Sequence, residues 1–549
     1  MQTFHAPRPL ALRHADLAAI LLLALALRLA LFNGPFGSDD TVYYARALDI
    51  SRGEWTVAHY NGALRYGFNI PAGLLMRVFG NSVFAANLWP LLCSLAEIAT
   101  VYFVGAALGG RRVAAIAALL LASAPLHIAV ASRIHTDAVV SAALSGSFAL
   151  LFFGLRRRSA GRLFAAGLCL GAVFWVKELA AVTYVAFLPL LAHFTARGSD
   201  RWAGRGRGLA AALGGLALMF ALHFALMAAI AGDPLHAIRT VTGAMQHSFI
   251  DGGQSEDAAA YYLPYLFTDL RHVGLLGWLA LLAGLTALFS RRSPDVSPIA
   301  GPRPAYLAWW LLGLLAVLSL FPVSLSPLRL PMKQSNYLTL FLAPLALAAA
   351  FGAQRLPRRA GDAAVGLSVA LGLALALLQQ ADYRAFTANG KALAALAAAS
   401  GPGELWIGST NNDNLGTMLA QVAGEGSAGR RSTWSSFRAA RADPAAWRQR
   451  VESAGPGARL NIAFDPQTLA WMAGPNPVTA PLPCWQAQAE VAPTGLGLGN
   501  LFAGAVAQGW AGLGVAPART LTARLDRLAH PLPAWVYSTK ATDLWCEHP

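Results

Sequence analysis

Apolar windows long enough to cross a membrane recur along the chain from Ala15 to about Gln380, and then they stop. A bilayer core about 30 Å thick needs about 20 apolar residues per helix. We therefore predict about 11 membrane-spanning helices, at residues 15–33, 84–108, 113–131, 137–155, 162–177, 179–196, 209–231, 272–289, 305–322, 337–354 and 362–380. No small-residue cleavage site follows the first apolar run, which is therefore interpreted as a retained signal anchor.

The arginine-rich connections alternate along this series of spans. They contain Arg111-Arg112, Arg156-Arg157-Arg158, Arg201 with Arg205 and Arg207, Arg291-Arg292, and Arg358-Arg359. Because short cytoplasmic loops carry the excess of Lys and Arg, this alternation predicts a cytoplasmic N-terminus. The residues after the last span are then expected on the outer side of the membrane.

Two of the predicted outer loops are long, from about Asn33 to Val83 and from about Gly232 to Arg271. Long loops in an economical bundle usually carry function. In the first loop, residues 41–51 and 70–79 are short and amphipathic, which predicts two helices lying in the membrane interface. In the second loop, Tyr261, Tyr262 and Tyr265 suit either a mobile lid or an interfacial aromatic cluster, and the sequence leaves both interpretations open.

The chain changes character after residue 380, where Gly, Pro, Asn and Arg increase. Apolar runs at 404–408, 460–464 and 533–538 predict buried strands. The predicted fold class is thus a polytopic α-helical membrane domain at 1–380 and a small soluble α/β domain at 381–549. An outer, oxidising location predicts a disulfide between Cys484 and Cys546, whereas Cys93 and Cys169 are expected to be buried apolar residues.

Composition agrees with a membrane protein. Of the 549 residues, 56% are hydrophobic and only 13% are charged, against about a quarter charged in soluble domains. The formal charge of +15 does not indicate nucleic-acid binding, because residues 381–549 contain 13 Lys+Arg against 11 Asp+Glu. The excess is loop arginine that orients helices and meets anionic lipid.

An acidic pair, Asp39-Asp40, directly follows the first span and Gly37-Ser38. Carboxylates are costly near hydrocarbon, and such a pair can supply a general base with an orienting neighbour or bind a metal ion. The alternative is structural, with Ser38 or Asp39 capping a helix that starts near Thr41. No cofactor is required by the sequence; a divalent metal is possible, with Asp40 as its ligand.

Further polar groups fall on the same predicted outer face: Arg133, His135, Asp137, Lys177, Glu178, Arg329, Lys333 and Tyr337. A single Lys at a helix end is usually an anchor that snorkels to the interface. Together, however, these groups predict a site with carboxylates on one wall and cations on the other. Cations near the lipid boundary suit a phosphate or pyrophosphate headgroup.

A series of short motifs follows the first span in a fixed order. The first are Asp39-Asp40-Thr-Val-Tyr43-Tyr44, Gly53-Glu-Trp55, Asn61-Gly62 and Tyr66, and the later ones are Asp137, the stretch from Gly171 to Lys177, and Asn336-Tyr337 to Pro344. This order resembles the protein O-mannosyltransferase and lipid A aminoarabinose transferase family, whose members are GT-C glycosyltransferases that use polyprenyl-phosphate sugars. The family's Lys-Pro-Pro is here Asn69-Ile70-Pro71, so Arg65 is the expected substitute for its phosphate-binding lysine. Asp40, Asn336 and Glu178 also depart from the pattern.

The resemblance implies a bacterial inner-membrane enzyme with a periplasmic C-terminal domain. It implies that Asp39 is the base, Asp40 its partner, and Arg65, Lys177 and Lys333 the groups that bind the donor phosphate. Tyr43, Arg133, His135, Asp137, Glu178 and Tyr337 are expected to support the substrates. The expected partners are membrane lipid, a lipid-linked sugar donor and a hydroxyl acceptor on a glycolipid, a polysaccharide or a protein, with inversion at the sugar.

Two other functions fit part of the pattern. A transporter or flippase of lipid-linked sugars would place ionisable groups near mid-membrane and often shows inverted repeats. Here the acids lie in outer loops, apart from Glu97, and no repeat is detected. The other is a ligase-like transferase that uses diphosphate donors.

Overall fold

The computed structural model describes residues 14–187, 189, 203–246, 258–289, 303–326, 328–330, 333–400, 404–424, 434–455, 458–511 and 516–546. These residues form two compact units. Unit 1 comprises Met1–Ala30, Gly53–Ala72 and Asn87–Ala376, and unit 2 comprises Leu31–Arg52, Gly73–Ala86 and Leu377–Pro549. The second unit thus includes most of the first long loop besides the C-terminal residues.

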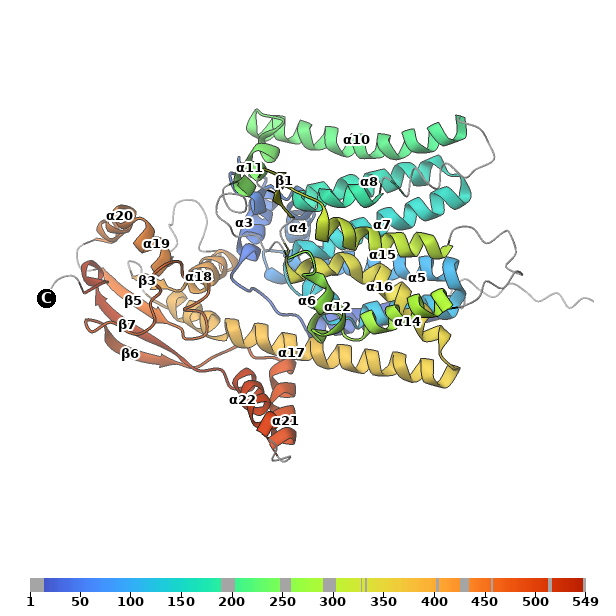
Figure 1. Cartoon of the computed structure of the whole chain (residues 1–549). Helices are drawn as coiled ribbons and strands as arrows, with labels where there is room; N and C mark the ends of the chain where they lie inside the picture. The colour runs from blue at the N-terminus through green and yellow to red at the C-terminus, as the bar shows by residue number, and fades with distance from the viewer. Residues whose placement is uncertain are drawn as a thin grey trace, which may run out of the picture. The chain divides into compact units, whose positions relative to one another are not determined.

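The first half of the chain is helical (Figure 1). Its elements are α2 (Ala15–Ala30), α3 (Asp39–Arg52), η1 (Asn61–Leu64), α4 (Tyr66–Phe79), α5 (Val83–Ala122), α6 (Pro125–Ala131), α7 (Thr136–Arg157), α8 (Ala160–Val176), η2 (Glu178–Thr183) and α10 (Ala203–Ala231). The helices predicted at 41–51 and 70–79 are present as α3 and α4.

The later helical elements are α11 (His236–Met245), α12 (Tyr262–Phe267), α13 (Leu270–Val273), α14 (Leu276–Phe289), α15 (Arg303–Leu320), η4 (Ser335–Leu338), α16 (Thr339–Arg355) and α17 (Arg358–Ala398). A two-stranded hairpin, β1 (Ser324–Leu325) and β2 (Leu328–Arg329), precedes η4.

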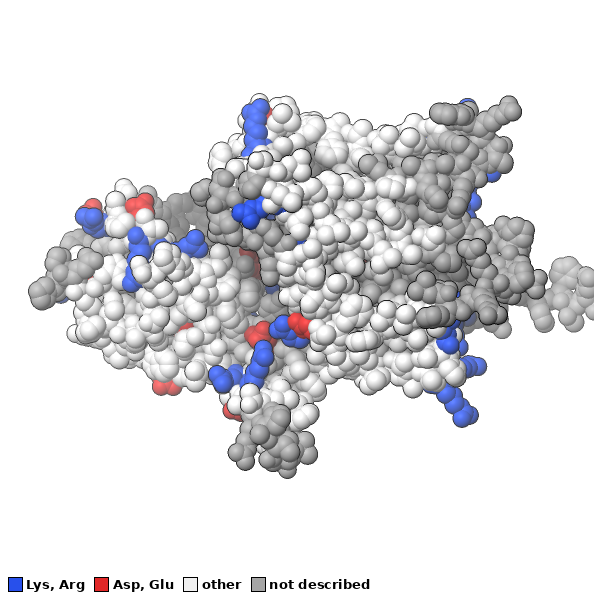
Figure 2. All heavy atoms as spheres, in the orientation of Figure 1, with Lys and Arg blue, Asp and Glu red and all other residues white. Residues whose placement is uncertain are grey.

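Among the described residues, five helices are long and apolar enough to cross a membrane: 83–122, 136–157, 206–231, 335–355 and 358–398. Shorter apolar helices lie at 160–176, 276–286 and 305–320. The chain is therefore a transmembrane protein, and the total of about 11 spans stays a prediction. Most of the visible surface of the helices is uncharged in Figure 2, and Lys and Arg gather at helix ends.

One predicted connection between spans is present as a helix break, and two predicted spans differ in detail from the structure. The predicted connection at 109–112 exists as a break at Gly110, whose φ of 83° is available to glycine without strain. The span predicted at 113–131 is interrupted before Pro125, because proline cannot continue a helix without losing a hydrogen bond. The span predicted at 179–196 begins as the short 3-10 helix η2, and most of its remainder lies outside the described residues.

Within unit 1, α7 packs against α8 and α16, α8 packs against α10, and α14 and α15 pack against α16. The α8–α10 contact depends on glycine: a Cβ at Gly167 would lie 1.9 Å from the Ala212 carbonyl oxygen, and one at Gly215 would lie 2.1 Å from that of Phe164. Small residues let membrane helices approach closely where no hydrophobic drive exists between them.

A five-stranded sheet forms the core of unit 2, in the order β4-β3-β5-β7-β6. Its strands are β3 (Leu405–Gly408), β4 (Trp434–Ser436), β5 (Arg459–Phe464), β6 (Gln486–Val491) and β7 (Ala534–Lys540). Strand β3 pairs in parallel with β4 and β5, and β7 is antiparallel to β5 and β6. The three strands predicted from sequence are present.

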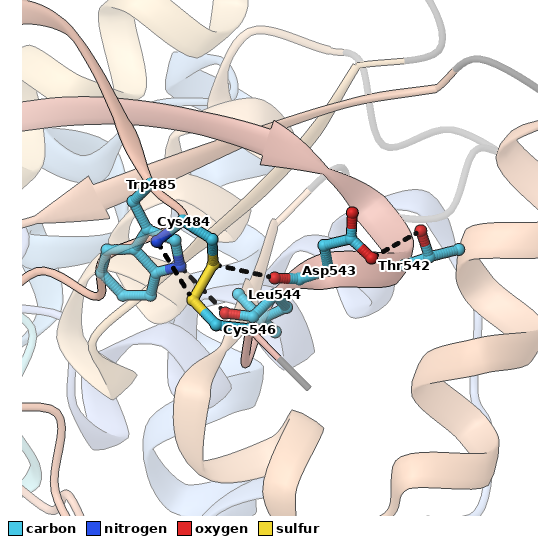
Figure 3. The surroundings of a disulfide bond; sticks show 6 residues. All are labelled: Cys484, Trp485, Thr542, Asp543, Leu544 and Cys546. Atoms are coloured by element: carbon cyan, nitrogen blue, oxygen red, sulfur yellow. Dashed lines mark hydrogen bonds between the residues drawn. A yellow bond between two sulfur atoms is a disulfide. The ribbon is translucent and has the colours of Figure 1, made fainter. Parts of the chain in front are cut away.

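The remaining elements of unit 2 are α18 (Thr410–Val422), α19 (Phe437–Ala442), α20 (Pro444–Ala454), α21 (Leu498–Ala511), α22 (Ala516–Ala529) and η5 (Ala541–Asp543). The structure joins Cys484 to Cys546, with their Cα atoms 5.6 Å apart (Figure 3). Beside the disulfide, Trp485 Nε1 donates to the Leu544 carbonyl oxygen at 2.9 Å. The bridge therefore ties the end of the chain to the segment that leads into β6.

Candidate active site

The two carboxylates of the acidic pair have different environments, although they are adjacent in sequence. Asp40 is 6% exposed, and its carboxylate accepts backbone N–H groups from Phe36 at 2.7 Å, Ser38 at 2.7 Å and Gly37 at 3.3 Å. Asp39, the first residue of α3, is exposed and accepts a hydrogen bond from the Tyr43 hydroxyl at 3.3 Å. Asp40 therefore closes the turn before α3, and Asp39 is the carboxylate that faces solvent.

This turn is held by α18 of the same unit. Asn411 Nδ2 donates to the carbonyl oxygens of Phe36 at 2.7 Å and Gly37 at 3.3 Å, and Asn414 Nδ2 donates to that of Gly37 at 3.0 Å. A Cβ at Gly37 would lie 2.6 Å from Asn411 Nδ2. The position therefore requires glycine both for this approach and for its φ of 84°.

An aromatic cluster around the side chain of Phe36 also holds the turn. The ring of Phe36 stacks on Phe386 with centroids 5.1 Å apart, and it meets the edges of Tyr383 at 5.1 Å and Trp471 at 6.2 Å. Such pairs add to the burial energy of the rings. Sequence reasoning missed both supports of the turn; the polar run 409–414 directly after the buried strand β3 was a signal of the α18 contact.

A second polar cluster lies in unit 1, where α7 begins and α8 ends. Asp137 is 2% exposed; its Oδ1 accepts from Lys177 Nζ at 2.7 Å, and its Oδ2 accepts from the amide of Asn336. Lys177 is 6% exposed, and its ammonium lies 4.2 Å from the centre of the Tyr337 ring. Lys177 is thus a buried, paired cation, and the snorkelling alternative does not describe it.

His135 joins this cluster as the cap of α7. Its Nδ1 accepts the backbone N–H of Asp137 at 3.2 Å, which requires that nitrogen to be unprotonated. Burial lowers the pKa of His135 to about 3, and the positive charges of Arg133, Lys177 and Arg65 act in the same direction, while Asp137 opposes them. The accepting Nδ1 and the lowered pKa both indicate a neutral imidazole.

Glu178 contributes a second carboxylate. Its Oε1 is buried and has no hydrogen-bond partner among the described residues. Burial raises the pKa of Glu178, and the charges of Arg65 and Lys177 act against this shift. An unsatisfied buried oxygen is costly, so this atom is a candidate contact for a polar substrate group.

The other predicted site residues lie as follows. Lys333 is 4% exposed and precedes η4, which carries Asn336 and Tyr337. Tyr262 is fully buried, and its ring centroid lies 5.3 Å from that of Phe341. The ring centroids of Tyr261 and Tyr265 lie 5.2 Å apart. The described part of the second long loop therefore includes a packed aromatic cluster. The acidic pair belongs to unit 2, and the cluster around Asp137 belongs to unit 1.

Sequence reasoning did not identify a charged network inside the helices of unit 1. Arg28 Nη2 lies 2.6 Å from His127 Nδ1, and His127 Nε2 lies 3.2 Å from Glu97 Oε2. The other oxygen of Glu97 accepts from the hydroxyls of Ser141 and Ser145, both at 2.7 Å. Ser141 and Ser145 follow Asp137 at one-turn intervals, so the network and the Asp137 cluster lie on one face of α7.

The described residues contain no group of three or more His, Cys, Asp or Glu side chains that could hold a metal ion.

A family model described as dolichyl-phosphate-mannose-protein mannosyltransferase matches residues 70–224. The range includes Arg133, His135, Asp137 and Lys177. A comparison with curated protein sequences gives no significant match.

Two solved structures share the fold over most of the chain. The crystal structure of ArnT from Cupriavidus metallidurans bound to undecaprenyl phosphate is 15% identical with a TM-score of 0.51, covering 83% of this chain and 94% of that chain. The same protein in the apo state is 14% identical with a TM-score of 0.52, covering 88% and 96%. The family match and the fold shared with ArnT agree with the resemblance found in the sequence motifs.

Proposed function

We propose that this protein is a membrane glycosyltransferase that moves a monosaccharide from a polyprenyl-phosphate carrier to a hydroxyl group of an acceptor. The observation that supports this most strongly is the buried cluster of Asp137, Lys177 and Asn336, which holds a cation where three apolar helices begin or end. The ArnT structure with the same fold was solved with undecaprenyl phosphate. A fixed cation at such a place suits a lipid phosphate.

In the proposed reaction, the exposed carboxylate of Asp39 takes the proton from the acceptor hydroxyl. The hydroxyl oxygen then attacks the anomeric carbon from the face opposite the phosphate, which inverts that carbon. The bond between the anomeric carbon and the phosphate oxygen breaks, and the lipid phosphate leaves with the electron pair. The cations that bind the lipid phosphate stabilise the charge that develops on it as it leaves.

The residues have distinct roles in this proposal. Asp40 orients its neighbour, because three backbone N–H groups already bind its carboxylate. Lys177, Arg65 and Lys333 bind the donor phosphate. Tyr43, Arg133, His135, Asp137, Glu178 and Tyr337 hold these groups or the sugar. The expected location is the bacterial inner membrane, with the C-terminal domain in the periplasm.

The charged network inside unit 1 does not favour the flippase alternative. Arg28, Glu97 and His127 are each 0% exposed and are bound to one another. A transport pathway needs ionisable groups that reach a water-filled cavity. A buried, fully paired network instead suits a structural link between helices.

The first test compares Asp39→Asn with the wild-type protein in transfer from a labelled undecaprenyl-phosphate sugar, using envelope lipid, glycan and protein fractions as acceptors. We expect a loss of about 10²–10⁴-fold, the usual contribution of a general base. Asp49→Asn removes a carboxylate from the same helix and is the matched control, expected to stay active. An Asp39→Asn protein with wild-type activity would rule out the assigned base.

The same assay in detergent separates the two functions. Transfer to an acceptor does not require two leaflets, so a glycosyltransferase remains active after the bilayer is removed. A flippase would show no covalent product under any of these conditions, and the absence of labelled acceptor with every fraction would contradict the proposal.

A further inference from the structure

Helix α21 exposes an apolar surface. Leu498 is 52% exposed and Leu501 is 73% exposed, and Trp510 at the end of the helix is 41% exposed. Leu496, just before the helix, is 40% exposed. Leu498, Leu501 and the exposed Ala505 fall on one helical face. Exposed apolar side chains on one helical face mark a candidate site of interaction with a protein or a membrane.

The opposite face of α21 is firmly attached to α17 and α22. Ala503 and Ala507 are buried in a cluster with Ala381 and Leu525. A Cβ at Gly499 would lie 2.1 Å from the Leu377 carbonyl oxygen, so the two helices are in close contact there. Figure 1 shows α21 and α22 side by side as a helical hairpin.

Polar bonds fix the same joint. Asn500 Nδ2 donates to the carbonyl oxygens of Ala381 at 3.0 Å and Leu528 at 2.7 Å. Gln380 Oε1 accepts the backbone N–H of Gly499 at 2.8 Å. The point along α17 at which the hairpin is attached is therefore fixed by residues 377–381.

The attachment point at residues 377–381 is also where α17 is expected to leave the membrane. The apolar part of α17 ends at Gln379-Gln380, which closes the last predicted span at 362–380. One turn later, the guanidinium of Arg384 donates to the carbonyl oxygen of Gly495 at 2.7 Å and to that of Phe32. Phe32 lies at the end of the first predicted span, so the hairpin starts beside two points where the chain emerges.

The second helix of the hairpin exposes two arginines and one carboxylate, Asp526. Helix α22 exposes Arg524 and Arg527 together with Leu521, which is 40% exposed. Apolar side chains beside arginines are typical of helices that lie in the membrane interface, where the arginines meet anionic headgroups.

We propose that the α21–α22 hairpin is a membrane-surface anchor, and that the apolar face of α21 inserts among the headgroups of the outer leaflet. Its partner is a lipid surface with anionic headgroups. The anchor fixes the part of unit 2 that follows α17 at a defined depth. This proposal does not depend on glycosyl transfer.

The test places a spin label on the full chain in nanodiscs that contain phosphatidylglycerol and phosphatidylethanolamine. The label is attached at Leu501→Cys, a mostly exposed position whose replacement spares the packed face, in a Cys93→Ala/Cys169→Ala background. The control label is at Gln449→Cys, an exposed residue of α20 in the same unit. Collision rates with oxygen and with a water-soluble nickel chelate report the depth of each label.

We expect the label at residue 501 to collide preferentially with oxygen and the label at 449 with nickel. The ratio of the two collision rates should differ by about tenfold between the sites, as for a side chain that moves from water into the apolar boundary. An equally water-accessible label at 501 would overturn the proposal. Protection from nickel only in discs that hold two protein copies would also overturn it, because a second chain would then cover the face.

Replacing both arginines tests the lipid class. In anionic discs, Arg524→Gln/Arg527→Gln should reduce the protection of the label at residue 501 from the nickel chelate. The protection should fall toward the value that the unchanged protein shows in purely phosphatidylcholine discs. Equal protection in both lipids for the unchanged protein would contradict the anionic part of the proposal.

Discussion

Asp137 and Lys177 form a buried ion pair, and this determines how the role of the lysine can be tested. Removing one partner of a buried pair leaves an uncompensated charge, which costs about 3–5 kcal/mol of stability. A simple Lys177→Ala variant would therefore lose activity for structural reasons even if the lysine never met a phosphate.

A double variant separates the structural role of Lys177 in the ion pair from its proposed role in phosphate binding. Lys177→Met and Asp137→Asn should each lower the unfolding temperature, and Lys177→Met/Asp137→Asn should recover most of the loss because neither charge remains unpaired. If Lys177 binds the donor phosphate, the double variant should be stable yet weak in donor use, with a raised KM or lowered kcat. Wild-type kinetics in the stable double variant would remove Lys177 from the phosphate site. Thermal unfolding in detergent and donor titration are the measurements.

At the scale of single residues, the sequence indicated most of the polar groups of the candidate site but few of the contacts between them. Lys177, Asp137 and His135 were predicted to meet because each lies at the outer end of an apolar span, and the structure brings them together. The burial of Asp40 could not be predicted, because it depends on a turn closed by Gly37 and held by Asn411 from far along the chain. The partners Arg28 and His127 are 99 residues apart, and no local pattern joins them.

At the scale of elements, α18 has a role that its position in the sequence does not suggest. Parallel strands bring their carboxyl ends to one edge of a sheet, where α/β proteins commonly bind ligands. Here the first turn of α18, after β3, uses Asn411 and Asn414 to bind the protein's own Phe36-Gly37 turn. The C-terminal residues thereby fix the start of α3, including Asp39.

Asn411→Ala should therefore impair transfer more than it impairs stability. Loss of its hydrogen bonds costs about 1 kcal/mol each, and the sheet should still unfold at nearly the wild-type temperature. We expect kcat to fall at least about tenfold, because the base is no longer held in place, with little change in KM for the lipid donor. Gln449→Ala in α20 is the matched control. Unchanged kcat in a folded Asn411→Ala protein would show that the turn positions itself without α18.

The elements themselves were largely predictable, and the exceptions have physical causes. Strong apolar periods predicted the long helices and β3, β5 and β7. The hairpin of α21 and α22 was missed because α21 has only 14 residues, too few for a span, and its exposed leucines resemble core positions. The break before Pro125 was missed because proline at the start of a helix follows a break that hydropathy does not register.

At the scale of the whole molecule, the orientation in the membrane is predicted from arginines at alternate connections. Arg111 and Arg112 directly follow the break at Gly110, and they form ion pairs with Asp16 at 2.9 Å and Asp362 at 2.7 Å. Both partners lie at the starts of other predicted spans, at residues 15–33 and 362–380. The three helix ends therefore meet on one side of unit 1, which is compatible with the predicted orientation.

Reporter fusions test this orientation. Fluorescent-protein fusions after Arg112, Arg158, Arg207, Arg292 and Arg359 should be active, because they are expected in the cytoplasm. Alkaline phosphatase fused after Pro549 should be active because the C-terminus is expected outside. The disulfide gives an independent measure of the same compartment: Cys484 and Cys546 should resist alkylation until a reductant is added, since the cytoplasm would keep them as thiols. A cytoplasmic C-terminus with both cysteines free would reverse unit 2 across the membrane, and with it the location proposed for Asp39 and for the hairpin anchor.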